Sequence, residues 1–186
     1  RYHWAETLNS EDNAAEAHQV ATLGKAAHPE SAGGKLCHNL IEQIELKSAS
    51  ISIERVWHDP LPEINVTYRN VDKVYFRVVK VDYQERLRSQ TGNPEYLERA
   101  GNRNRNRNRN RNTGLTIEDL VRQPSVRSWS KQLPATDDFR QRTEELAAPE
   151  DLKPGFYVLL ASHDPEFANR DKQLSYAPFW ISKLSI

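Results

Sequence analysis

The sequence predicts a mainly β protein: a seven-stranded antiparallel sandwich of the immunoglobulin or fibronectin type III kind, preceded by a helical hairpin. Residues 48–186 contain short segments with apolar side chains at every second position, separated by polar turns. This alternation is typical of strands with one buried face. Residues 1–47 instead space their apolar side chains as a helix does. We therefore divide the chain into a helical segment, 1–47, and a sandwich, 48–186.

The helical segment is expected to form two helices joined by a short turn. The first runs from Tyr2 to Ala27 and stops at His28, because the following proline disfavours the α conformation there. The second opens at Ser31 or Gly33 and continues to about Lys47, with one apolar face formed by Leu36, Cys37, Leu40, Ile41 and Ile44. This pair is similar to one unit of a helical repeat whose other units precede Arg1. Cys37, the chain's single cysteine, is interpreted as a buried apolar side chain rather than a reactive thiol.

Three strands are expected in the first half of the sandwich. The alternating segments are Ser50–Trp57, Ile64–Arg69 and Lys73–Asp82. Short links connect them, so we expect an antiparallel meander. Val74, Phe76 and Val78 share one face of the third strand, and Tyr75, Arg77 and Val79 point outward or toward a neighbour.

Four more strands complete the prediction: 125–133, 139–147, 156–161 and 173–184. The segment 139–147 is polar on both faces, which suits an edge strand. The segment 156–161 is the most apolar and is therefore placed at the centre of a sheet. In the last strand Ala177, Phe179 and Ile181 share one face, and Tyr176, Trp180 and Leu184 share the other.

An insertion without alternation, at about 83–123, separates the two halves. Short helices are expected at Asn93–Arg99 and Thr116–Val121, the second opened by Thr116 with Asp119 three residues later, close to a capping box. Between them lies an Asn-Arg tract, 102–112, with Arg at alternate positions from Arg103 to Arg111. Such a tract could bind RNA or acidic lipid. It lacks interleaved aromatic residues and the net charge of the chain is zero, so a solvated insertion is favoured.

No arrangement of residues predicts catalysis, a metal or a cofactor. The sequence has no Gly-rich phosphate loop or nucleophile elbow, and its histidines lack zinc-site spacing. His58-Asp59-Pro60 and His163-Asp164-Pro165 are interpreted as turns. A Ca²⁺ site from Asp164, Glu166 and Asp171 is a weak alternative, because the spacing lacks the EF-hand glycine and terminal glutamate. No apolar run is long enough to span a membrane, and no signal peptide is present.

Two further patterns have alternative interpretations. Asn65-Val66-Thr67 matches an N-glycosylation acceptor but lies within a predicted strand. Large aromatic side chains could line a carbohydrate groove or fill the sandwich core, and core is favoured; they are Trp57, Trp129, Tyr157 and Trp180. The chain starts within a predicted helix, at Arg1, and ends on a predicted strand, at Ile186, which predicts an excised piece of a larger protein.

Several motifs, in this order, resemble bacterial alpha-2-macroglobulins over about Pro29 to Ile186. The run 28–37, followed by Leu40-Ile41, resembles the segment before their first macroglobulin-like domains, and 66–78 resembles a strand, turn and Tyr-x-Arg strand. The segment 152–159 is similar to their Leu-x-Pro-Gly-x-Tyr turn, and 176–182 to the strand that leads into the next domain.

The resemblance implies a secreted, periplasmic or surface-anchored protease trap, in which strings of macroglobulin-like sandwiches frame a bait region and some members carry a thioester. Cys37 is followed by His38-Asn39-Leu40, so the Cys-x-x-Gln thioester motif is absent here. The expected role is therefore a non-catalytic scaffold, with neighbouring domains of the same polypeptide as partners and proteases as targets of the full-length protein. A stand-alone adhesion or carbohydrate-binding sandwich using Trp57, Trp129 or Trp180 is the alternative.

Overall fold

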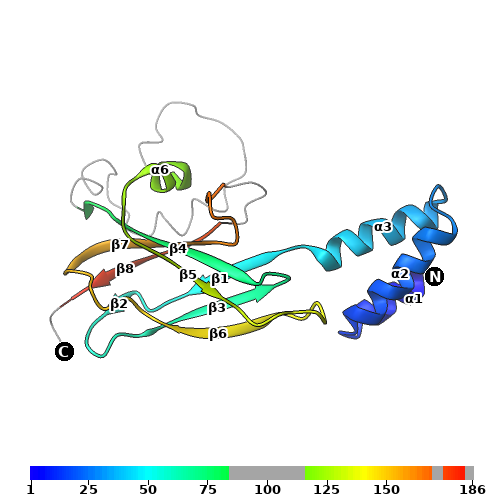
Figure 1. Cartoon of the computed structure of the whole chain (residues 1–186), viewed down its shortest axis with the longest axis horizontal. Helices are drawn as coiled ribbons and strands as arrows, with labels where there is room; N and C mark the ends of the chain where they lie inside the picture. The colour runs from blue at the N-terminus through cyan, green and yellow to red at the C-terminus, as the bar shows by residue number, and fades with distance from the viewer. Residues whose placement is uncertain (84–115, 169–173, 183–186) are drawn as a thin grey trace.

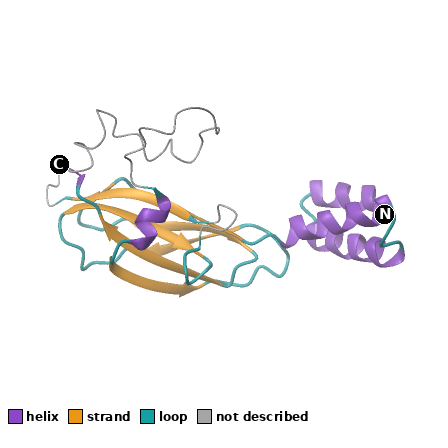
Figure 2. Ribbon diagram, turned by 90° about the horizontal axis from the view of Figure 1, so that it is seen from above, coloured by secondary structure: helices purple, strands orange, loops and turns teal. Residues whose placement is uncertain are grey.

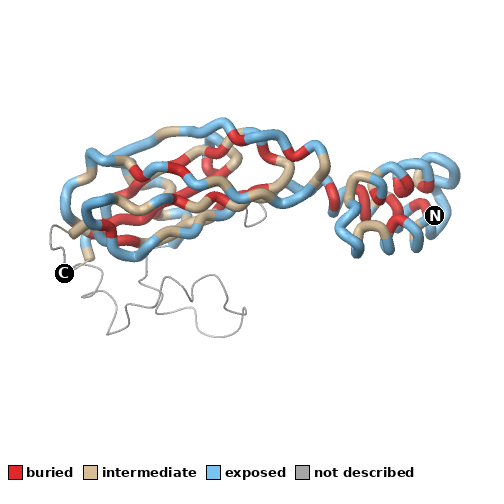
Figure 3. Tube along the Cα trace, turned by 90° about the horizontal axis from the view of Figure 1, so that it is seen from below, coloured by how far each residue is buried: buried red, intermediate tan, exposed pale blue. Residues whose placement is uncertain are grey.

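The computed structural model describes residues 1–83, 116–168 and 174–182. They form a helical unit and, beside it, a pair of β-sheets (Figure 1). The insertion helix predicted at Asn93–Arg99 and the Asn-Arg tract, 102–112, lie outside these residues. Buried residues concentrate in two places, inside the helical unit and between the sheets (Figure 3). Each part therefore has a core of its own.

The helical unit contains three helices, α1 (Tyr2–Ser10), α2 (Ala14–Ala27) and α3 (Ala32–Glu45). The predicted hairpin, with one helix from Tyr2 to Ala27, was therefore wrong. The chain breaks at Asp12, where φ is 60°, and the Asn13 amide donates to the Leu8 carbonyl across the turn. Aspartate tolerates this left-handed conformation better than most residues. The three helices share a core of mostly small side chains: Ala5, Ala17, Val20, Ala21, Cys37, Leu40, Ile41 and Ile44.

The start of α3 follows the predicted pattern. Ser31 is its N-cap, and the Ser31 hydroxyl accepts a hydrogen bond from the Gly34 amide at 3.0 Å. Gly34 also lets the helix approach the preceding turn, since a Cβ at this position would stand 1.9 Å from the His28 carbonyl oxygen. Cys37 is 1% exposed, which confirms the prediction of a buried side chain.

Residues 48–83, 116–168 and 174–182 form eight strands in two sheets. One sheet has the order β1-β3-β6 and the other β2-β8-β7-β4-β5. All neighbours are antiparallel except β2 and β8, which are parallel. The strands are β1 (Ser48–Ser52), β2 (Val56–Trp57), β3 (Glu63–Arg69), β4 (Lys73–Lys80), β5 (Ser125–Gln132), β6 (Arg142–Ala147), β7 (Gly155–Ser162) and β8 (Ser175–Ile181).

The predicted first strand, Ser50–Trp57, is two strands that join different sheets. Ser48–Ser52 pairs with β3, whereas Val56-Trp57 pairs with the end of β8. Between them the Trp57 indole donates to the Glu54 carbonyl at 2.9 Å, which closes a local turn. The described part of the chain therefore contains eight strands, where seven were predicted.

The predicted three-strand meander was also wrong. β3 lies between β1 and β6, and β4 lies in the other sheet between β7 and β5. The connection turns at Asn70, whose φ is 57°, and carries the chain from one sheet to the other. Two other predictions are confirmed: the polar β6 is an edge strand, and the apolar β7 is the middle strand of its sheet.

The inner faces of the two sheets share one apolar core. Alternate residues of β4 contribute Val74, Phe76 and Val78, as predicted. β3 contributes Ile64, Val66 and Tyr68 from the opposite sheet, each with 0% exposure. The alternation read from the sequence therefore assigns the buried face of β4 correctly.

A second apolar cluster covers the outer face of the five-stranded sheet. Helix α6 (Ile117–Arg122) lies on this face (Figure 2) and buries Leu120 completely. Thr116 and Asp119 form the capping box, which confirms the helix predicted at this position. The cluster between α6 and the sheet contains Val79, Val81, Leu120, Phe156, Val158, Leu160, Phe167 and Leu174.

Candidate functional site at the far end of the sandwich

Three aromatic rings meet at the end of the five-stranded sheet that lies away from the helices. Trp180, in β8, has its ring centroid 4.9 Å from that of Phe156 and 4.8 Å from that of Tyr83. The Tyr83 and Phe156 centroids are 5.1 Å apart. Phe156 and Tyr83 are largely covered, whereas Trp180 is 38% exposed. We call Tyr83, Phe156 and Trp180 the aromatic cluster.

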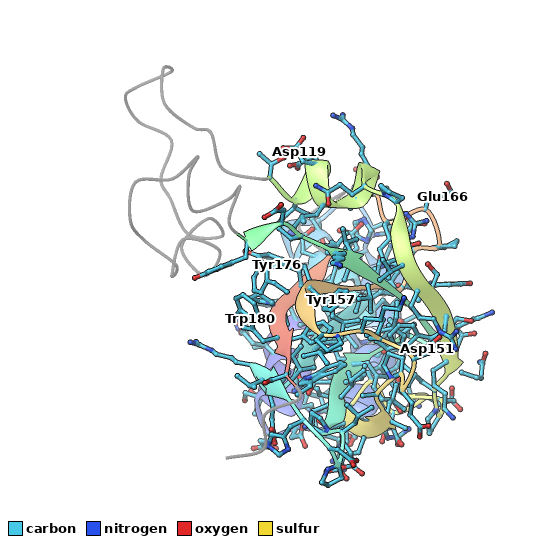
Figure 4. The ribbon with its side chains drawn as sticks, turned by 90° about the vertical axis from the view of Figure 1, so that its left-hand side faces the viewer. Asp119, Asp151, Tyr157, Glu166, Tyr176 and Trp180 are labelled. Carbon is cyan, nitrogen blue, oxygen red and sulfur yellow. The ribbon has the colours of Figure 1, made fainter. Side chains whose placement is uncertain are left out.

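The strand register creates the aromatic cluster. Phe156 in β7 is the direct partner of Trp180 in β8, and the alternation of β8 turns Phe179 inward and Trp180 outward. Figure 4 looks at this end of the molecule and shows Trp180 at the periphery, with Tyr157 among the strands. Lys80 and Asp82 flank the rings, and together they line a hollow of about 550 Å³. The hollow thus combines apolar ring surface with two charged side chains.

A second hollow, of about 940 Å³, lies at the same end, between the β2–β3 and β6–β7 loops. Its apolar lining includes Leu61 and Ile181, and its acidic lining residues are Asp59, Glu63 and Glu150, with His58 beside them. The Glu145 carboxyl shares a hydrogen bond with Glu63 and repels its charge, which raises the pKa of Glu63. The loops therefore give this end of the sandwich a negative rim.

The two His-Asp-Pro segments form turns, as predicted. His58 Nδ1 lies 3.3 Å from the Asp59 carbonyl oxygen, and His58 is exposed. The Asp164 carboxylate accepts hydrogen bonds from the amides of Glu166 and Ala168, so it closes its own loop. His163 is partly buried; desolvation lowers its pKa, Lys47 lowers it further by repulsion, and Asp164 opposes both effects.

Of the three candidate Ca²⁺ ligands, the structure describes two. Asp164 and Glu166 lie in the β7–β8 loop, and Asp171 lies outside the described residues. Across residues 1–83, 116–168 and 174–182, no three His, Cys, Asp or Glu side chains gather as metal ligands would. No helix in the same ranges is long and apolar enough to cross a membrane.

The four aromatic candidates divide between core and surface. Trp57 and Tyr157 are buried, and both stack on Phe179, with centroid distances of 3.9 and 5.6 Å. Trp129 stacks on Phe76 at 4.9 Å. Only Trp180, among these four, is exposed at its strand position. Core packing is therefore confirmed for Trp57 and Tyr157, and the predicted groove residues do not converge on one surface.

Sequence reasoning missed Tyr83 and Phe156 as members of a surface cluster. Phe156 was assigned to a central strand, and Tyr83 was placed at the edge of the insertion. The available signal was alternation in β7, which separates Phe156 from Tyr157 and places it on the face opposite the core. Asn65, the glycosylation candidate, lies in the middle strand of the three-stranded sheet, opposite Ser52 and Glu145.

Comparison of the sequence with models of known protein families gave no match, and comparison with curated proteins gave none either.

Proposed function

We propose that the chain is a non-catalytic structural module of a secreted, periplasmic or surface-anchored alpha-2-macroglobulin-like protein. In this proposal its two sheets form an immunoglobulin-like sandwich that acts through contacts with neighbouring domains. The support comes from the order of the strands, from one tyrosine contact and from the motifs that resemble the family. None of the three requires a reactive residue.

The strand order supports the immunoglobulin-like assignment. If β1 and β2 are counted as one strand that changes sheets, the described residues give seven strands in the order A, B, C, C′, E, F, G. The first sheet then reads A-B-E and the second G-F-C-C′, with β2 added beside G. Immunoglobulin domains likewise place A, B and E in one sheet and G, F and C in the other, and variable-type domains extend the second sheet with C′ and C″.

The Tyr157 hydroxyl carries the proposal. It donates a hydrogen bond of 2.7 Å to the carbonyl oxygen of Lys153, four residues upstream, at the entry to β7. A tyrosine near the start of strand F that bonds back to the preceding corner is a hallmark of immunoglobulin-like domains. The same residues belong to Leu152-Lys153-Pro154-Gly155-Phe156-Tyr157, the segment that resembles the macroglobulin-like turn. One contact thus joins the fold assignment to the family resemblance.

Protease trapping by the full-length protein tests this function. The full-length protein that contains this chain is mixed with trypsin, and cleavage of a large protein substrate is compared with cleavage of a small chromogenic peptide. A trap should block the large substrate and spare the small one, because only the former is excluded from an enclosed protease. The isolated 186-residue chain is the control and should block neither. Unchanged cleavage of the large substrate by the mixture would contradict the proposal.

The exposure of Trp180 favours carbohydrate binding as a second candidate function. An exposed indole beside Lys80 and Asp82 offers an apolar face and polar groups, a combination found in small-molecule sites. Affinity electrophoresis through gels containing soluble polysaccharides tests it, with Trp180→Ala as the variant. Trp4→Ala is the matched control, because Trp4 is exposed on the helical unit, far along the chain from the aromatic cluster. Retardation lost in Trp180→Ala alone would support this candidate, and equal migration of all three proteins in every gel would oppose it.

A further inference from the structure

The connection between the helical unit and the sandwich is only two residues long. α3 ends at Glu45 and β1 begins at Ser48, so Leu46 and Lys47 form the whole covalent link. A short link fixes the distance between two bodies, but it leaves them free to rotate about the link. Whether they rotate depends on the contacts made beside it.

The first such contact caps the end of α3. The Asn70 side-chain amide, from the β3–β4 turn, donates to the carbonyl oxygens of Ile44 at 2.6 Å and Leu46 at 3.2 Å. The last carbonyls of a helix lack partners within the helix, so a donor from the sandwich satisfies them here. Asn70 is itself held, because its backbone amide donates to the hydroxyl of Thr136 at 2.8 Å, and Thr136 is 7% exposed.

Two further contacts come from the loop before β6. The Phe139 ring stacks on the His18 ring of α2, with centroids 4.8 Å apart and planes at 22°. The edge of the His18 ring is also held, since its Nε2 lies 2.7 Å from the Glu45 carboxylate. Arg140 donates to the Asp12 carbonyl in the α1–α2 turn at 2.9 Å, and its Nε lies 3.5 Å from the Asp12 carboxylate.

These contacts hold the helical unit at three separate places: the end of α3, the side of α2 and the α1–α2 turn. Contacts at three different elements oppose both bending and rotation about the two-residue link. Asn70 and Phe139 also have left-handed backbones, with φ of 57° and 58°. This conformation is rare for a bulky residue such as Phe, and it persists where surrounding contacts determine it.

We propose that the helical unit and the sandwich form one rigid arm, locked by Asn70, Phe139 and Arg140 acting as a latch. The arm transmits a movement of the sandwich to the helical unit instead of absorbing it at the link. This inference is independent of the alpha-2-macroglobulin proposal, because it rests only on contacts within residues 12–140.

Distance measurements between two spin labels test the latch. In a Cys37→Ala background, labels are attached at Leu23→Cys on α2 and Ser128→Cys on β5, both of which are exposed positions. Double electron–electron resonance on the labelled chain should give one narrow distance distribution. A broad or multi-peaked distribution in the parent protein would overturn the proposal without any further variant.

Glycine substitutions then identify the residues that lock the arm. Asn70→Gly and Phe139→Gly remove the side chains while keeping a residue that adopts positive φ freely, so the turns themselves are not strained. Together they should broaden the distribution and add components absent from the parent protein. Arg140→Ala is a milder surface variant and should broaden it less. Glu150→Gly, in a loop at the other end of the sandwich, is the control and should leave the distribution unchanged. A distribution that stays narrow in the folded double variant, checked by circular dichroism, would also overturn the assignment of the latch.

Discussion

Tyr157 and Lys153 are joined by a hydrogen bond that spans the corner leading into β7, with the phenol oxygen as donor and the Lys153 carbonyl oxygen as acceptor 2.7 Å away. Tyr157 is 3% exposed, and its burial raises the pKa of the phenol. The hydroxyl therefore remains protonated and able to donate throughout the neutral range. Because the tyrosine lies in the middle strand of the larger sheet, the bond ties a surface corner to the core.

Replacing Tyr157 with Phe should destabilise the protein by about 1 kcal/mol, because it removes one hydrogen bond and leaves the Lys153 carbonyl without that donor. The ring and its contact with Phe179 are kept. Urea denaturation followed by circular dichroism gives the free energy of unfolding. Tyr75→Phe is the matched control: the described part of the chain offers its hydroxyl no hydrogen-bond partner, so the substitution should have almost no effect. Equal effects of the two substitutions would show that the corner bond contributes nothing.

Leu120→Ala should lower the free energy of unfolding by about 3 kcal/mol, in the range measured for buried leucines that leave a cavity. Leu120 is the fully buried residue by which α6 covers Val158 and Leu160 on the outer face of the sheet. Val126→Ala, at a position 50% exposed on the neighbouring β5, is the control and should change stability little. A small loss for Leu120→Ala would mean that α6 is not part of the folded core.

Local patterns in the sequence were sufficient for individual elements. Val74, Phe76 and Val78 were assigned to the core by alternation alone, and Thr116 with Asp119 identified α6 by a contact between residues three apart. Both signals depend on neighbours along the chain. They hold because strand pleating and helix capping are local geometry.

Pairing between strands could not be predicted in the same way. Ser50–Trp57 alternates without interruption, yet its two ends pair with β3 and β8, which are far apart in the sequence. The choice is made by distant partners such as Trp180, whose amide donates to the Arg55 carbonyl. The helix break at Asp12 does have a local signal in the sequence, because no apolar residue lies between Leu8 and Ala14.

Dependence on distant residues also explains why the aromatic cluster could not be predicted from the sequence. Alternation shows that Trp180 and Phe179 face opposite ways, but not which of the two faces is covered. The outer face of this sheet is itself partly buried by α6, so an outward position such as Phe156 is also largely hidden. Trp180 is exposed because it lies outside the apolar cluster that α6 covers.

His163 should make the protein less stable in mild acid. Its pKa in the folded state is lowered from the ordinary 6.5, so just below pH 6.5 the unfolded chain binds more protons than the folded chain. The free energy of unfolding should therefore fall as the pH drops below about 6.5, and this contribution should level off once the pH is below the folded-state pKa. Above pH 6.5 it should be fully retained.

The variant His163→Gln should lose this part of the pH dependence, as measured by urea denaturation between pH 4.5 and 8, a window of roughly two units on each side of the ordinary histidine pKa. His3→Gln is the control, since the His3 side chain is 93% exposed. Parallel pH profiles for His163→Gln and the parent protein would show that burial of this imidazole does not affect stability.

Gly24 and Cys37 should show strong coupling. An added Cβ at Gly24 would lie 2.6 Å from the Cys37 sulfur, so Gly24→Ala forces either the buried sulfur or the two helices to shift. Overpacking of this kind costs about 1–3 kcal/mol, which outweighs the gain of about 1 kcal/mol in helix propensity when Ala replaces Gly.

In a Cys37→Ala background the sulfur is gone, and the nearest remaining atoms to the new methyl group are the Arg1 Cβ at 3.3 Å and the residue 37 Cβ at 3.7 Å. Gly24→Ala should therefore destabilise the parent protein but stabilise the Cys37→Ala variant. A double-mutant cycle of thermal or urea unfolding measures the difference as a coupling energy. If Gly24→Ala changes the free energy of unfolding with the same sign in both backgrounds, the clash with the Cys37 sulfur does not decide its effect. Gly34→Ala provides the contrast, because its methyl group would meet the His28 backbone carbonyl, which no side-chain substitution can remove.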